Sequence, residues 1–210
     1  MNKIITKHVP IEELSLKVKT VNKYLQIKQN SDVYDDLHRM IFDLYSKYKP
    51  EFTPVYQYRI LAVKSVHDDG VKVILGNQVR FTGIGIHRLL AKSKYAALFV
   101  ATIGSDIDPI ITELQRSDLL AGYCLEGIAS ALVTSLLDQL KQELEKAATN
   151  QSCELSYRYA PGYAHWDLKE QSNLFSALQP EQIDVHLTDA FFVVPRNSLT
   201  GVYGFNEKTT

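Results

Sequence analysis

The stretch that decides the fold lies at residues 122–148, which read GYCLEGIASALVTSLLDQLKQELEKAA. Its apolar side chains recur at the spacing of one helix face, a pattern that predicts an amphipathic helix. The members of this stripe are Leu125, Ile128, Ala129, Leu132, Val133, Leu136, Leu137, Leu140 and Leu144. We therefore expect a central core helix that begins around residues 117–122. Small residues in its first half, such as Gly122 and Gly127, predict close packing of another element against it.

The segment upstream of this helix has the pattern of strands. Residues 52–82 contain many strand-forming residues, and Asp69-Gly70 and Gly76-Asn77 are turn signals within them. This arrangement predicts a three-stranded antiparallel meander. A short helix is expected from Gly85 to Ala91, followed by a buried strand from Tyr95 to Ile103.

The N-terminal segment is predicted to be helical. A helix is expected from Ser31, whose hydroxyl can cap it, to Pro50, which stops it. Residues 12–27 are expected to form a shorter helical region. We therefore divide the chain into an N-terminal helical extension over 1–50 and a main domain over 51–210.

The C-terminal third completes an α+β fold. A strand is predicted over residues 154–159 and a helix over 168–178, followed by short strands over 185–187, 190–194 and 201–205. The expected fold class is thus α+β, with an antiparallel twisted sheet, a long core helix and an N-terminal helical extension.

Composition limits the function classes. The net charge of -1 shows no excess of positive charge of the kind that binds nucleic acid or an anionic membrane. The apolar run at residues 96–100 is too short to span a bilayer, and the N-terminus lacks the apolar core of a signal peptide. Cys124 and Cys153 are therefore expected to be reduced thiols of a cytoplasmic protein. Their spacing does not suit a metal, so no metal site is expected.

The second informative stretch is Tyr157-Arg158-Tyr159-Ala160-Pro161-Gly162-Tyr163. Pro161 fixes its own φ and Gly162 permits a left-handed backbone, so the chain should form a bare corner beside Arg158. The planar fork of Arg158 suits a carboxylate. On a strand Tyr157 and Tyr159 would share one face and Arg158 would take the other, while Tyr163 can swing back from beyond the turn. The alternative is a simple proline-glycine turn with a surface Arg.

Other familiar sites fit poorly. Gly83-Ile84-Gly85 lacks the third glycine of a dinucleotide loop, because Arg88 stands in its place, and the chain has no P-loop motif. Ser198 and His165 are present, but no Gly-x-Ser-x-Gly elbow accompanies them, which disfavours a hydrolase. No catalytic residue is assigned from these patterns.

The Arg-Tyr-Ala-Pro-Gly-Tyr sequence at 158–163 resembles the Arg-x-x-Pro-Gly-Tyr signature of the activation domain of cobalamin-dependent methionine synthase. Three later segments resemble that family in the same order. They are Trp166-Asp167-Leu168, Leu187-Thr188 before Phe191-Phe192, and Pro195-Arg196-Asn197-Ser198-Leu199-Thr200-Gly201. Residues 51–210 are on this basis similar to a methionine synthase activation domain.

The resemblance implies a ligand and its contacts. Activation domains of this family bind S-adenosylmethionine, and the signature Arg holds its carboxylate. Carried over, this assigns the carboxylate to Arg158. The other cofactor-binding residues implied are Ala160, Gly162, Tyr163, Ser198 and Gly201.

The resemblance also implies a partner. The chain contains no Asp-x-His-x-x-Gly motif for cobalamin and no cysteine cluster for zinc, so the cobalamin should reside on another protein. We expect a stand-alone subunit that acts on a cobalamin-binding methionine synthase or another corrinoid protein. It would support reductive methylation of cobalamin, with S-adenosylmethionine as methyl donor and a separate electron donor. Two alternatives stay open: a non-catalytic binding or chaperone module that does not use S-adenosylmethionine, and an unrelated small-molecule methyltransferase.

Overall fold

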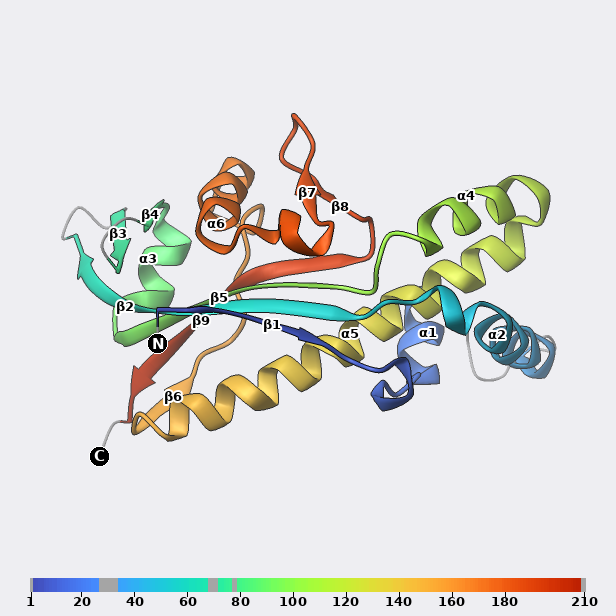
Figure 1. The fold of residues 1–210 in the computed structure, drawn as a ribbon, viewed down its shortest axis with the longest axis horizontal. Coiled ribbons are helices and arrows are strands. Elements are labelled where there is room, and N and C mark those ends of the chain that lie inside the picture. Colours follow the sequence, from blue (N-terminus) through green and yellow to red (C-terminus); the bar gives the residue numbers. More distant parts are fainter. Residues whose placement is uncertain (1, 27–33, 68–71, 77–78, 209–210) are drawn as a thin grey trace.

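The fold is built on one twisted antiparallel sheet (Figure 1). The computed structural model describes residues 2–26, 34–67, 72–76 and 79–208. The sheet has the order β4-β3-β2-β5-β9-β6, and β1 pairs with β2 beside this path. Its strands are β1 (Ile4–His8), β2 (Val55–Val66), β3 (Lys72–Leu75), β4 (Val79–Thr82), β5 (Ser93–Thr102), β6 (Cys153–Leu155) and β9 (Ser198–Glu207). The expected α+β class is confirmed.

Helices cover both faces of this sheet. Figure 1 shows α5 along one face, α3 and α6 over the other, and α1, α2 and α4 gathered at one end. The helices are α1 (Val18–Tyr24), α2 (Tyr34–Tyr48), α3 (Ile84–Leu90), α4 (Ile107–Ser117), α5 (Leu119–Thr149) and α6 (Gln171–Leu178). A small separate hairpin, β7 (His186–Leu187) and β8 (Val193–Val194), precedes β9.

The predicted core helix is α5. Asp118 caps it, because its carboxylate accepts from the backbone N–H of Ala121 at 3.1 Å. The apolar stripe is buried except at Leu137, which is partly buried, and Leu132 and Leu136 are fully buried. Although α5 is long and apolar enough to cross a membrane, 72% of its most apolar window is buried inside the protein. It is therefore a core helix, and each buried Leu contributes about 1.5–3 kcal/mol through removal from water.

The sheet separates two apolar clusters. Side chains alternate along β5, so Phe99 packs toward α5 while Leu98 and Val100 pack toward α3 and α6. Along β9, Tyr203 joins the α5 cluster and Val202 joins the other one. Both faces of these central strands are buried. A ligand could therefore reach the sheet only at the ends of the strands or along the side of β9.

Close packing against the first half of α5 is confirmed. A Cβ atom at Gly122 would lie 2.6 Å from the backbone nitrogen of Gln115 on α4. A Cβ atom at Gly127 would lie 3.3 Å from Val21 on α1. These glycines therefore serve helix packing.

The predicted meander is confirmed in β2, β3 and β4, but the N-terminus differs from expectation. Residues 4–8 form β1, which pairs with the first half of β2. The described part of residues 12–27 contains the end of a 3-10 helix, Ile11–Glu13, and the short helix α1. The expected cap Ser31 and turn residues Asp69, Gly70 and Asn77 lie outside the described residues. The boundary at residue 50 stays a prediction, because shared packing does not show which part folds alone.

Candidate functional site

The strand predicted over residues 154–159 ends early, at Leu155, and an irregular segment that contains Arg158 follows it. β6 stops at Leu155, and the hydroxyl of Ser156 then accepts the backbone N–H of Gly204 at 2.8 Å. Pairing resumes where Tyr159 and Val202 exchange both backbone hydrogen bonds. Between these points this segment takes three residue steps, from 156 to 159, against two on β9, from 204 to 202. Such a bulge interrupts the regular ladder and can re-aim side chains. Tyr157 and Tyr159 nevertheless lie on one side, as predicted, with ring centroids 6.4 Å apart.

The bulge leaves Arg158 with neutral partners. Its Nη2 donates to the hydroxyl of Tyr163 at 2.6 Å, and its Nη1 donates to the carbonyl oxygen of Thr200 at 3.4 Å. The guanidinium also lies 5.6 Å from the centre of the Tyr163 ring. In the part of the chain that the structure describes, Arg158 has no carboxylate partner. Its positive charge is therefore held in place without being neutralised.

The corner itself is closed by its own backbone. The N–H of Gly162 donates to the carbonyl of Trp166 at 2.9 Å, and the N–H of Tyr163 donates to the carbonyl of Ala160 at 3.1 Å. Gly162 has φ +89°, which an L side chain rarely adopts, and an added Cβ would lie 3.1 Å from Leu168. Both N–H groups thus already have hydrogen-bond acceptors within the protein. The backbone of Gly162 is exposed on its other face and accessible to a ligand.

Aromatic rings fix the corner to the core. Trp166 is buried and meets Phe81 edge to face, with centroids 5.3 Å apart. Tyr159 stacks on Trp166 at 5.7 Å with an interplanar angle of 3°, and Tyr163 meets Tyr159 edge to face at 5.9 Å. The Tyr159 hydroxyl donates to the carbonyl of Ala164. Packing of this kind holds the corner in a fixed position against the core.

A hollow of about 540 Å³ lies beside the corner. Of the predicted residues, Tyr163 lines it, together with Gly83, His165 and Trp166. Gly83 is required there, because a Cβ atom would lie 2.9 Å from the Trp166 ring. Arg158 does not line this hollow and lies on the bulged segment beside β9, so the corner presents two adjoining surfaces rather than one closed pocket.

The two predicted site residues on β9, Gly201 and Ser198, lie in different places. Gly201 lies against the corner, because a Cβ atom there would meet the Tyr159 carbonyl oxygen at 2.8 Å. Ser198 lies at the start of β9, paired with Thr102, and its hydroxyl donates to the Thr102 hydroxyl at 2.8 Å. The structure therefore joins Arg158, Ala160, Gly162, Tyr163 and Gly201, and leaves Ser198 farther along the strand.

Charged groups of α5 and the charge of Arg158 act together on the pKa of Tyr203 on β9. Burial raises the pKa of Tyr203, the positive charge of Arg158 opposes that rise, and the negative charges of Asp138 and Glu145 add to it. All three charged groups consequently lie within electrostatic range of one hydroxyl. Asp138 also forms an ion pair with Lys17 at 2.5 Å. Glu145 in turn pairs with Lys141 at 3.5 Å, so both carboxylates already have a lysine partner.

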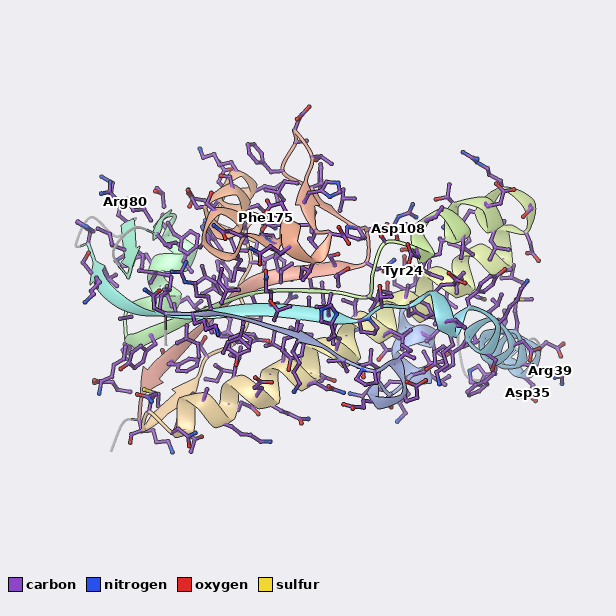
Figure 2. All side chains as sticks on the ribbon, in the orientation of Figure 1. Tyr24, Asp35, Arg39, Arg80, Asp108 and Phe175 are labelled. Atoms are coloured by element: carbon purple, nitrogen blue, oxygen red, sulfur yellow. The ribbon has the colours of Figure 1, made fainter. Side chains whose placement is uncertain are left out.

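Sequence reasoning missed a polar cluster at the other end of β9. Glu126 on α5 is buried, and it accepts from Arg196 at 3.0 Å and from the Asn197 side chain at 3.2 Å. Asp108 on α4 accepts from the backbone N–H of Arg196 at 2.9 Å. Figure 2 shows Asp108 at the end of the sheet, near the start of α4. A charged residue inside the apolar stretch of α5 was the available signal, because buried charges are paired.

Metal ligands do not gather in the described residues, where no group of three or more His, Cys, Asp or Glu side chains could hold an ion. Both cysteines are free and buried, and burial raises the pKa of the Cys124 thiol. The Cys124 thiol is therefore a poor nucleophile and a poor ligand.

This geometry matches a known class of protein. Residues 86–210 match the family described as vitamin B12 dependent methionine synthase, activation domain. Because the match covers more than half of the chain, the protein belongs to this family. No curated protein matches the chain.

A solved structure has the same fold. The chain superposes on the crystal structure of the MetH reactivation domain bound to AdoHcy with a TM-score of 0.76 and 15% sequence identity. The superposition covers 100% of this chain and 80% of that chain. At this level of identity the likeness establishes the fold, and the chemistry has to come from the residues present.

Proposed function

We propose that this chain binds S-adenosylmethionine at the Arg158 corner and supports the reductive methylation of cobalamin held by another protein. One observation carries the proposal: Arg158 is fixed beside the corner with only neutral acceptors among the described residues, the state of an Arg that awaits a carboxylate. Family membership and the AdoHcy carried by the structural neighbour support the choice of ligand.

The proposed roles follow from charge and shape. Arg158 binds the methionine carboxylate, because its fixed guanidinium carries an uncompensated positive charge. The Tyr163 ring offers a flat face for the adenine, and the bare backbone at Gly162 lets a large cofactor approach. When bound, S-adenosylmethionine supplies the methyl group, and the chain contributes position and exclusion of water.

The partner is proposed to be a cobalamin-binding methionine synthase or another corrinoid protein, with a separate one-electron donor. The cobalamin would meet the corner directly, because a methyl donor has to lie close to its acceptor. Two exposed aromatics at the bulge and the turn, Tyr157 and Tyr163, are suited to such a contact.

Two experiments test the proposal. Calorimetry with S-adenosylmethionine and with AdoHcy should show saturable binding to the protein; absence of heat with both would favour the non-catalytic module. In the second experiment a cobalamin protein with oxidised cobalamin is mixed with a reductant and S-adenosylmethionine. Adding this chain should accelerate formation of methylcobalamin, seen by absorbance. An equal rate of methylcobalamin formation without this chain would contradict the proposed role.

A further inference from the structure

A second hollow opens between β2, β4 and α6, and it shares no described lining residue with the hollow at the corner. Its volume is about 430 Å³, which is the size of a small-molecule site. Leu61, Leu75 and Val79 give it an apolar wall. Its polar lining consists of Asn2, Arg59, Arg80, Asn173 and Ser176.

Arg59 is held rigidly in this hollow by uncharged groups. Its Nε donates to the carbonyl oxygen of Asn2 at 3.1 Å, and its Nη2 donates to the side-chain oxygen of Asn2 at 2.8 Å. Its Nη1 donates to the carbonyl oxygen of Ala177 at 2.9 Å. Since every one of these acceptors is neutral, the bonds orient the guanidinium without compensating its charge, and Nη1 and Nη2 each keep a second N–H.

Arg80 adds a second positive charge. It extends from β4 at the outer end of the sheet (Figure 2) and is exposed. Its backbone pairs with Ile74 on β3, but within the described ranges its side chain forms no hydrogen bond or ion pair. The described lining thus contains two guanidinium groups and no carboxylate, in a chain whose net charge is -1.

The acidic group behind the hollow is already satisfied. Glu170 is buried and accepts from the side-chain amide of Asn173 at 3.2 Å and from the backbone N–H of Thr82 at 3.1 Å. It lines the hollow at the corner instead. Its carboxylate therefore does not pair with Arg59 or Arg80.

We propose that this hollow binds a small molecule that carries a phosphate group, with Arg59 and Arg80 on the phosphate oxygens. Two guanidinium groups match the charge of a phosphate dianion, and Arg forms paired hydrogen bonds to phosphate oxygens. The side chains of Asn173 and Ser176 add polar contacts, and the apolar wall accepts a short carbon skeleton. This binding site is independent of the Arg158 corner.

Calorimetry at low ionic strength tests the site with glycerol 3-phosphate, inorganic phosphate and succinate as probes. Both phosphates should bind, glycerol 3-phosphate more tightly. Arg80→Gln should weaken both by roughly 10- to 100-fold, the equivalent of one charged hydrogen bond. Because Arg80 is exposed and free, this variant should keep its thermal midpoint. Arg116→Gln, an exposed Arg on α4, is the matched control and should bind as the wild type does.

Arg59→Gln provides a second variant, whose folding is checked by thermal unfolding because Arg59 also holds Asn2 and Ala177. Loss of phosphate binding in a folded Arg59→Gln protein would support the site. The proposal is overturned if neither phosphate binds at millimolar concentration, if Arg80→Gln binds as tightly as the wild type, or if succinate binds more tightly than the phosphates.

Discussion

Arg158 reaches across the turn at residues 160–162 and donates from Nη2 to the Tyr163 hydroxyl at 2.6 Å. This contact joins the bulge on the edge of β9 to the far side of the corner. It keeps the guanidinium beside the exposed backbone of Gly162 while leaving its charge without a counter-ion among the described residues. A ligand carboxylate would thus meet a cation that is already oriented.

Arg158→Ala should weaken S-adenosylmethionine binding by roughly 1.5–3 kcal/mol, the range for a charged hydrogen bond. Calorimetry measures this loss. Tyr163→Phe removes the hydroxyl that competes for Arg158 but keeps the ring, so it should weaken S-adenosylmethionine binding less than Arg158→Ala does. Unchanged affinity in Arg158→Ala would remove this residue from the site.

A bulky residue at Gly162 should abolish the accelerated methylation of the partner's cobalamin. Gly162→Val would force a β-branched residue to φ +89° and toward Leu168, and would cover the open face of the corner. Gly76→Ala is the control, because it also strains a positive φ, +56°, but lies away from the corner. If Gly162→Val stays folded and remains fully active, the cobalamin does not dock at this corner.

Leu132→Ala and Leu136→Ala should each lower the free energy of unfolding by about 2–5 kcal/mol, because each leaves a cavity under the sheet. Leu120→Ala on the same helix is the matched control, since Leu120 is exposed, and it should change the value by at most about 0.5 kcal/mol. Denaturant unfolding followed by circular dichroism provides the values. Equal effects at Leu120 and Leu132 would contradict the assignment of the buried face.

Arg196→Ala should destabilise the protein by roughly 1–3 kcal/mol, because the buried Glu126 would lose a charged donor. The loss should stay below that of a fully buried pair, since the Arg196 side chain is 47% exposed. Arg116→Ala, whose ion pair with Glu113 is exposed on both sides, should cost almost nothing. Thermal or denaturant unfolding of the two variants side by side distinguishes a buried pair from a surface pair.

Acid should weaken the contact between α5 and β2. Burial alone would raise the pKa of Glu143, but hydrogen bonds from Tyr56 and Tyr58 and the charge of Lys7 outweigh it and hold the pKa below its ordinary value of 4.5. A lowered pKa in the folded state stabilises it above the unfolded pKa. This contribution is lost as the pH falls from about 4.5 through the folded pKa.

The double variant Tyr56→Phe, Tyr58→Phe tests that pH dependence. It removes both hydroxyl donors to Glu143, so the free energy of unfolding should fall less steeply below pH 4.5 than in the wild type. Unfolding is measured by urea at several pH values. An identical slope in the two proteins would show that Glu143 does not carry this dependence.

The sequence by itself determined the elements that have a strong local pattern. The apolar stripe of residues 125–144 requires one buried face, so it predicted α5, and the turn-separated strand formers of residues 52–82 predicted the meander. The Arg-x-x-Pro-Gly-Tyr stretch predicted the corner, because proline and glycine restrict the backbone locally. These features depend on neighbours in sequence.

Tertiary structure alone decided the rest, because it depends on contacts between distant residues. β1 has a short and largely exposed pattern, and it is a strand because it pairs with β2. The bulge that turns Arg158 toward Tyr163 arises where the Ser156 hydroxyl replaces a backbone acceptor for Gly204, 48 residues away. The pairing of Glu126 with Arg196 spans 70 residues. Local propensity contains no information on such partners, since the free energy of a hydrogen bond or ion pair comes from the geometry of the folded chain.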